Sequence, residues 1–218
     1  MNSLPTESAL DIKAGNNPAF FELLAQDITD KGYSVHHNAL PGGLGQMLLD
    51  ELLERLPLAF QKAGIGRNLE SNVNTLIRTD EISWIDDRTK SGAAWIDWTT
   101  SLQTFLNARL FLGLFSFESH FAHFSKGDYY RRHQDAFSGD ESRILSIVIY
   151  LNKDWSPDDA GELVLYPDDT EKAAIKIAPQ HGTVAVFLSK ETPHEVLVTN
   201  SDRLSIAGWF HVNNSSKN

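Results

Sequence analysis

Two residues near the middle of the chain, His133 and Asp135, have the types and the spacing that bind a metal ion. In a β-strand alternate side chains point to the same face, so these two side chains would project together. An imidazole and a carboxylate side by side are two of the three ligands of the facial triad that holds non-haem Fe(II) and leaves positions open for a co-substrate and dioxygen. The triplet alone is a weak signal, because an edge-strand His paired with a nearby Asp also produces it.

The third ligand would have to come from elsewhere, and His194 is the candidate, since it follows a proline and opens a short apolar run. Arg203 comes nine residues later and opens another apolar strand. A buried guanidinium is costly without an anion, and its planar fork matches a carboxylate. A metal beside such an arginine suits a dicarboxylic co-substrate such as 2-oxoglutarate. Each residue alone also fits a surface position at a strand end, so the joint order carries the prediction.

Composition restricts the classes of protein to which the chain can belong. It has 218 residues, a net charge of -10 and no cysteine. The acidic balance argues against a protein that coats nucleic acid, and the absence of cysteine removes disulfides, zinc–thiolate sites and iron–sulfur clusters. No secretory signal and no apolar stretch of transmembrane length is visible, so we expect a cytoplasmic protein with no membrane partner.

The elements that would position these residues begin after a polar, aperiodic segment at 1–16, which we expect to be a flexible leader. Apolar residues at four-residue steps then predict three amphipathic helices. These are expected at about 17–32, 44–56 and 95–106. Extended stretches are expected at 33–37 and 77–85. Residues 64–75 have loop composition and are the segment we expect to act as a lid.

From residue 113 onward, short runs of β-branched and aromatic residues alternate with turn residues. Strands are expected at about 114–124, 128–134, 143–151, 161–166, 173–178, 183–188, 194–199 and 203–212. This order indicates a mainly β fold with flanking helices, namely a double-stranded β-helix (jelly roll) with an N-terminal helical layer. No linker divides the chain. We therefore expect one domain over 17–218, with mostly helical support at 17–112 and the jelly-roll core at 113–212.

The order of these segments resembles the Fe(II)- and 2-oxoglutarate-dependent oxygenases, in particular the prolyl 4-hydroxylase-like branch that contains the hypoxia-inducible-factor prolyl hydroxylases and their bacterial relatives. The resemblance covers about residues 75–212. It rests on the segments YYRRHQDAF, RILSIVIYLNKDW, AGELVLYPDD, TPHEV and RLSIAGWFHV.

The resemblance implies a role for each matching residue. His133, Asp135 and His194 would be the iron ligands. Arg203 would bind the distal carboxylate of 2-oxoglutarate. The other residues implied around iron and 2-oxoglutarate are Tyr150, whose phenol would help Arg203, Ser146 near the co-substrate, Tyr130 lining the iron pocket and Trp209 walling the active site.

The segment RTDEISW resembles the part of the family that grips the substrate peptide. Arg78 and Asp80 are its polar residues, and we expect Asp80 to pair with Arg143, a further substrate-binding residue. Phe124 stands where family members usually carry tyrosine. This departure would alter how the iron-proximal carboxylate of 2-oxoglutarate is held.

By resemblance, the chain is a dioxygenase that uses Fe(II), 2-oxoglutarate and O2, with ascorbate in a supporting role. It would hydroxylate a prolyl residue of a protein, with a translation-related protein as one expected target, and release succinate and CO2. One alternative is a small-molecule 2-oxoglutarate hydroxylase, which would show a closed pocket rather than a peptide groove. Another is a non-catalytic jelly-roll binding module, which has no need of an intact ligand set. A nucleobase oxygenase fits poorly because the chain lacks a basic stripe.

Overall fold

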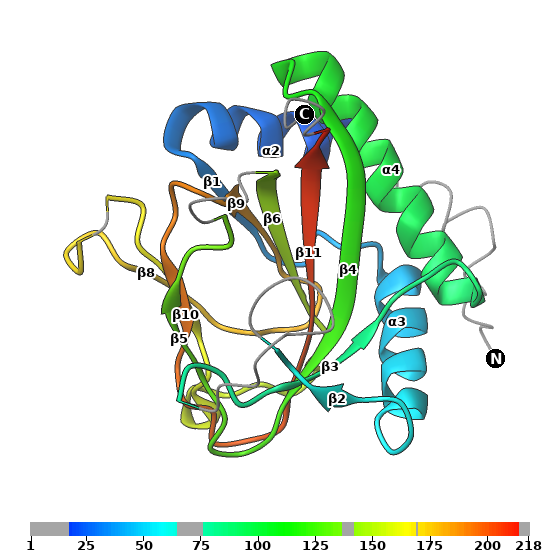
Figure 1. The fold of residues 1–218 in the computed structure, drawn as a ribbon, viewed down its shortest axis with the longest axis vertical. Coiled ribbons are helices and arrows are strands. Elements are labelled where there is room, and N and C mark those ends of the chain that lie inside the picture. Colours follow the sequence, from blue (N-terminus) through cyan, green and yellow to red (C-terminus); the bar gives the residue numbers. More distant parts are fainter. Residues whose placement is uncertain (1–17, 65–75, 137–141, 169, 214–218) are drawn as a thin grey trace, which may run out of the picture.

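The computed structural model shows a β-structure flanked on one side by helices (Figure 1). It describes residues 18–64, 76–136, 142–168 and 170–213. The expected leader at 1–16 and nearly all of the expected lid at 64–75 lie outside the described residues. No helix in the described part of the chain has the length and apolar character needed to cross a membrane.

Two antiparallel sheets pack face to face, as a double-stranded β-helix requires. The larger sheet comprises, in spatial order, β1 (Tyr33–His36), β9 (Val184–Leu188), β6 (Arg143–Tyr150), β11 (Arg203–Val212), β4 (Leu114–Phe124), β3 (Glu81–Trp84) and β2 (Gln61–Lys62). The smaller sheet comprises β5 (Tyr130–His133), β10 (His194–Val196), β7 (Leu163–Leu165) and β8 (Ile175–Ile177). The predicted fold class is confirmed.

Three helices cover the face of the larger sheet that points away from the smaller one (Figure 1). They are α2 (Pro18–Lys31), α3 (Gly42–Arg55) and α4 (Lys90–Leu110). The period of two along β11 divides the interior into two cores: Ile206 and Phe210 pack among the helices, whereas Arg203 and Trp209 face the space between the sheets. The core beneath the helices is apolar, and the space between the two sheets holds the polar side chains of a cavity together with a second apolar cluster.

The strands after residue 113 lie where the alternation predicts them, each within three residues at either end. Helix α4 is longer than the predicted 95–106. The helix starts at Lys90 because the side chain of Thr89 accepts a hydrogen bond from the Gly92 amide and caps it. The prediction missed this first turn because the turn contains no apolar periodicity. The N-terminal half also supplies β1 to one edge of the larger sheet, and β2 and β3 to the other.

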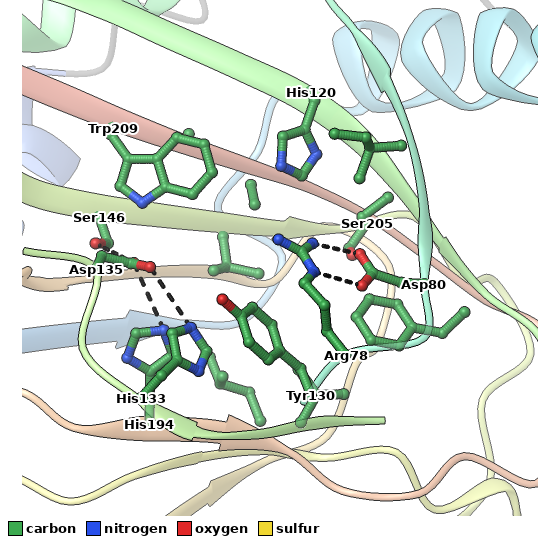
Figure 2. A pocket seen from close by; sticks show the side chains of 18 of the residues that line it. Arg78, Asp80, His120, Tyr130, His133, Asp135, Ser146, His194, Ser205 and Trp209 are labelled. Carbon is green, nitrogen blue, oxygen red and sulfur yellow. Dashed lines mark hydrogen bonds and ion pairs between the residues drawn. The ribbon is translucent and has the colours of Figure 1, made fainter. Parts of the chain in front are cut away.

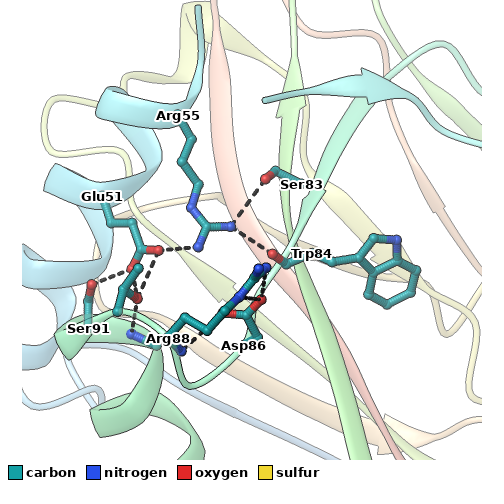
Figure 3. A network of polar contacts seen from close by, with 9 residues as sticks. Glu51, Arg55, Ser83, Trp84, Asp86, Arg88 and Ser91 are labelled. Carbon is teal, nitrogen blue, oxygen red and sulfur yellow. Dashed lines mark hydrogen bonds and ion pairs between the residues drawn. The ribbon is translucent and has the colours of Figure 1, made fainter. Parts of the chain in front are cut away.

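A buried carboxylate, Glu51 of α3, fastens the helical layer to the sheet (Figure 3). It accepts hydrogen bonds from Thr89, at 2.9 Å, and from Ser91 at the start of α4, and it pairs with Arg55. Arg55 in turn donates to the Trp84 carbonyl at the end of β3, at 2.7 Å. One charged pair therefore holds two helices and a strand in register.

Replacing Glu51 by alanine should lower the free energy of unfolding by about 3 kcal/mol, because it leaves two hydroxyls without their acceptor and a partly buried guanidinium without its counter-ion. Urea unfolding followed by circular dichroism measures the change. Glu54→Ala, an exposed position on the same helix, is the matched control and should cost less than about 0.5 kcal/mol. Equal stability of the two variants would show that the network contributes little.

Candidate active site

The residues predicted to bind a metal meet at one end of the space between the sheets (Figure 2). His133 and His194 lie directly opposite each other on the paired strands β5 and β10. The carboxylate of Asp135 faces the Nε2 atoms of both rings: its oxygens are 3.6 Å from Nε2 of His133 and 3.5 Å from Nε2 of His194. One ligand atom from each residue lies within 4.8 Å of the others, which is the spacing of a three-ligand metal site.

The sequence predicts that His133 and Asp135 project from one face of a single strand, but in the structure only His133 belongs to the strand. Strand β5 ends at His133, and Asp135 lies in the bend that follows it. The reason is that β10 begins at His194, directly opposite His133, so β5 has no pairing partner beyond this point. Gln134 then fixes the bend by donating to the Lys190 carbonyl at 2.6 Å.

Backbone carbonyls orient both imidazoles. Nδ1 of His133 donates to the Arg131 carbonyl at 2.8 Å, and Nδ1 of His194 donates to the Thr192 carbonyl at 3.0 Å. Each proton on Nδ1 leaves the lone pair of Nε2 facing Asp135, which is the tautomer that a metal requires. Burial also lowers the pKa of His194 to about 4, so this ring is neutral at physiological pH.

The carboxylate of Asp135 is held ionised in a buried place. Ser146 donates to it at 2.6 Å, and the Ser146 hydroxyl is itself 2.9 Å from that of Ser189. Burial alone would raise the pKa of Asp135, but His194, His133 and the Ser146 hydroxyl together lower it well below its usual range. Ser146, predicted to lie near the co-substrate, therefore also orients a ligand of the metal.

A cavity of about 370 Å³ extends from these three ligands between the sheets. Arg203, at the start of β11, is only 1% exposed and lines this cavity. Its Nε donates to the Gly161 carbonyl at 2.9 Å and its Nη1 to Ser205 at 3.1 Å. In the described ranges no carboxylate pairs with Arg203, and burial lowers its pKa. A buried cation without a counter-ion is the environment that an anionic ligand would complete.

Tyr150 supplies a second buried hydrogen-bond donor, next to Arg203. Its ring lies 5.0 Å from the Arg203 guanidinium, and its buried hydroxyl has no hydrogen-bond partner among the described residues. Burial raises the pKa of Tyr150 to about 12, so the hydroxyl remains a donor. Tyr150 packs against Arg203 and is not itself a lining residue of the cavity. The two donors fit one carboxylate of 2-oxoglutarate.

Phe124 lies at this same end of the cavity. Its ring is 4.9 Å from the Arg203 guanidinium, with which it pairs across β4 and β11. The ring of Phe124 therefore packs on the residue predicted to bind the distal carboxylate, and the expected effect of the missing phenol on the iron-proximal carboxylate stays a prediction.

Arg78 and Asp80, predicted to grip the substrate, pair with each other. Two parallel hydrogen bonds of 2.8 and 2.6 Å join the guanidinium of Arg78 to the carboxylate of Asp80. The guanidinium also lies 4.4 Å from the ring of Tyr130, which stacks on His133 at 3.6 Å. Arg78 is therefore connected to the metal-binding candidate His133 through the ring of Tyr130 (Figure 2).

Arg143 does not pair with Asp80, and that prediction is wrong. Arg143 donates to Glu118 at 2.9 Å and lies 3.9 Å over the ring of Trp209, whereas both oxygens of Asp80 are taken by Arg78. The physical reason is register, since β11 lies between β6 and β4 and places Glu118, rather than Asp80, beside the start of β6. Arg143 and Trp209 both line the cavity.

Comparison with known proteins agrees with this geometry. Residues 119–211 match the model of the 2OG-Fe(II) oxygenase superfamily. The crystal structure of a Pseudomonas putida prolyl-4-hydroxylase is 34% identical, with a TM-score of 0.81 over 89% of this chain and 100% of that one. The chain belongs to the 2OG-Fe(II) oxygenase superfamily. This oxygenase also shares its fold with a Trichoplax adhaerens prolyl hydroxylase in complex with a hypoxia inducible factor oxygen degradation domain peptide fragment, at 24% identity and a TM-score of 0.79 over 94% of each chain.

A third structure shows that the fold also serves other chemistry. The non-haem α-ketoglutarate-dependent epimerase SnoN from nogalamycin biosynthesis is 14% identical, with a TM-score of 0.63 over 90% of this chain and 84% of that one. Fold similarity at this level therefore leaves the substrate open.

Fe(II) and 2-oxoglutarate are the cofactors of this oxygenase, and the site has the residues to hold both. His133, Asp135 and His194 would hold the iron, and Arg203 with Tyr150 would hold a carboxylate of 2-oxoglutarate. When bound, the two cofactors supply the oxidation of a C–H bond by dioxygen. The chain itself orients both imidazoles through hydrogen bonds from Nδ1 to backbone carbonyls and keeps Asp135 ionised.

The lining of the cavity also includes residues that were not predicted as site residues, among them His120 of β4 and Trp84 of β3. The sequence contained a signal for His120, which is four residues before Phe124 and therefore on the same face of the predicted strand. Trp84 had no comparable signal, because only the pairing of β3 with β4 brings it opposite His120.

Glu118 makes the stability of this oxygenase depend on pH. The hydrogen bond from His211, with that from Arg143, lowers the pKa of Glu118 to about 2. A depressed pKa stabilises the fold above the ordinary pKa of glutamate, and this contribution is lost as the pH falls towards 2. The side chain is 38% exposed, so solvent screening reduces the contribution to about 1 kcal/mol.

Glu118→Gln should therefore lose about 1 kcal/mol less unfolding free energy than the wild type when the pH is lowered from about 5 to about 3. Urea unfolding at the two pH values measures this. The same exchange at the exposed Glu54 is the control, and an identical pH slope in wild type and Glu118→Gln would contradict the role of Glu118.

Proposed function

We propose that this oxygenase hydroxylates a prolyl residue within a protein or peptide. The observation that carries the proposal is the similarity to the Pseudomonas putida prolyl-4-hydroxylase, which extends over the whole of that chain at 34% identity. A likeness of this extent covers all the strands that carry the cavity, and the residues of such a cavity select the substrate.

The form of the cavity favours a peptide over a free small molecule. Trp84, one of its lining residues, is 46% exposed, so the cavity reaches the surface of the molecule beside an aromatic ring. Exposed aromatic side chains at the edge of a pocket supply rigid apolar area for a partner chain. The peptide complex of the Trichoplax adhaerens enzyme, which has the same fold, is consistent with this mode of binding.

The test is succinate formation from 2-oxoglutarate with Fe(II) and O2, in the presence of an acetylated, amidated peptide library in which one central proline is flanked by mixed residues. We expect the rate to rise with the library, and mass spectrometry to place one added oxygen atom on the proline. A library with alanine in place of the proline is the matched control. Equal rates with the two libraries would refute prolyl hydroxylation.

A small-molecule hydroxylase is the second candidate, because the same fold is found in SnoN, an epimerase from nogalamycin biosynthesis. Separating a cell lysate into a macromolecular fraction and a small-molecule fraction distinguishes the two. Succinate formation stimulated only by the small-molecule fraction would favour this candidate, and stimulation only by the macromolecular fraction would favour the peptide.

A further inference from the structure

His120 is a buried imidazole that none of the expected roles in the cavity uses. It is 2% exposed, lies on β4 and lines the cavity, into which its ring points (Figure 2). Its Nδ1 lies 3.2 Å from the Phe121 carbonyl, which can only accept, so Nδ1 carries the proton. The other nitrogen, Nε2, is then an acceptor, and it has no hydrogen-bond partner in the described part of the chain.

Two indole rings enclose this imidazole. The ring of Trp84 meets it edge-on at 5.3 Å, and the ring of Trp209 lies at 5.4 Å on another side. Trp84 is half exposed, whereas Trp209 is buried. A ligand that enters beside Trp84 and approaches Trp209 therefore passes the acceptor of His120, and the two indoles would exclude water from a hydrogen bond made there.

The charges around His120 keep it an acceptor. Burial and the positive charge of Arg78 lower the pKa of His120 to about 4, so the ring is neutral at physiological pH. The guanidinium of Arg78 is engaged by Asp80, and that of Arg143 by Glu118. The Nε2 acceptor faces the cavity and is therefore available to a donor on a ligand, and a hydrogen bond made in this apolar place is strengthened.

A prolyl substrate restricts which donor this can be. The nitrogen of the target proline carries no hydrogen, so the nearest backbone donor on its C-terminal side is the N–H of the following residue. Resting on the proposed prolyl hydroxylation, we propose that His120 is a specificity-determining residue whose Nε2 accepts a hydrogen bond from the backbone N–H of the residue after the target proline, between the rings of Trp84 and Trp209. The enzyme would then discriminate against a target proline followed by a residue that lacks this N–H.

The experiment compares two forms of the proline library, one with alanine after the proline and one with N-methylalanine in that place. Loss of one hydrogen bond between neutral groups should raise the wild-type KM about five- to tenfold. In His120→Leu, which has no acceptor, the ratio of the two KM values should fall below about twofold. His120→Gln, whose side-chain carbonyl can accept in the same place, should restore much of the ratio.

His123→Leu is the matched control, because His123 lies on the opposite face of the same strand and does not line the cavity. Its ratio should equal that of the wild type. A wild-type ratio near one would overturn the inference without any variant, and a ratio that persists in His120→Leu would show that the methyl group only clashes. If neither library stimulates succinate formation, the proposed prolyl hydroxylation fails, and this inference fails with it.

Discussion

Replacing His133 by alanine is expected to lower succinate formation from 2-oxoglutarate at least about a thousandfold, because it removes one of three ligands of the iron. The two remaining ligands come from different segments, β10 and the bend after β5, so they cannot hold a metal in a fixed geometry by themselves. Succinate release and Fe(II) binding at equilibrium should both be lost. Loss of turnover with full retention of Fe(II) affinity would mean that the metal lies elsewhere.

The matched control is His36→Ala. His36 is a partly exposed imidazole whose Nε2 lies 3.1 Å from the carboxylate of Asp27, and it is not one of the residues that line the cavity. Turnover should stay within about twofold of the wild type in this variant. The comparison separates the loss of a metal ligand from the loss of any His–Asp contact. Melting temperatures of both variants verify that the fold is intact.

Replacing Arg203 by methionine should raise the KM for 2-oxoglutarate by about two orders of magnitude or more. A buried charge pair that loses one partner costs roughly 2–5 kcal/mol, which corresponds to a change of about 30- to 5,000-fold. Arg203→Lys keeps the charge but loses the planar fork, so we expect a smaller but clear rise of about tenfold. Fe(II) affinity in the absence of 2-oxoglutarate should not change.

A thermal shift gives the second measurement for Arg203. Saturating 2-oxoglutarate with an inert divalent metal should raise the melting temperature of the wild type, since a ligand that binds only the folded state stabilises it. The same addition should leave Arg203→Met almost unchanged. Wild-type KM and a full thermal shift in Arg203→Met would remove Arg203 from the 2-oxoglutarate site and leave the buried guanidinium without an explanation.

Much of this protein is determined locally by its sequence. The strands follow from short runs of β-branched and aromatic residues bounded by turn residues, because such runs favour extended structure wherever they lie in the chain. The His133–Asp135 pair and Arg203 could be proposed from residue type and joint order, because a metal and a buried anion need particular ligands and few other residues supply them. The prediction that His194 completes the set relied on the order of segments, and the structure brings it opposite His133.

The contact partners of several predicted site residues became clear only from the tertiary structure. Asp80 pairs with Arg78, Arg143 pairs with Glu118, and Phe124 packs on Arg203, all contrary to or beyond what the sequence predicted. Asp80 and Arg78 are near neighbours in the chain, whereas the other two contacts join strands of the larger sheet and follow from the register of β4, β6 and β11. A shift of one residue in that register would turn every side chain to the other face. Contacts across strands are therefore a property of the closed fold, whereas the residues able to make them can be read from the chain.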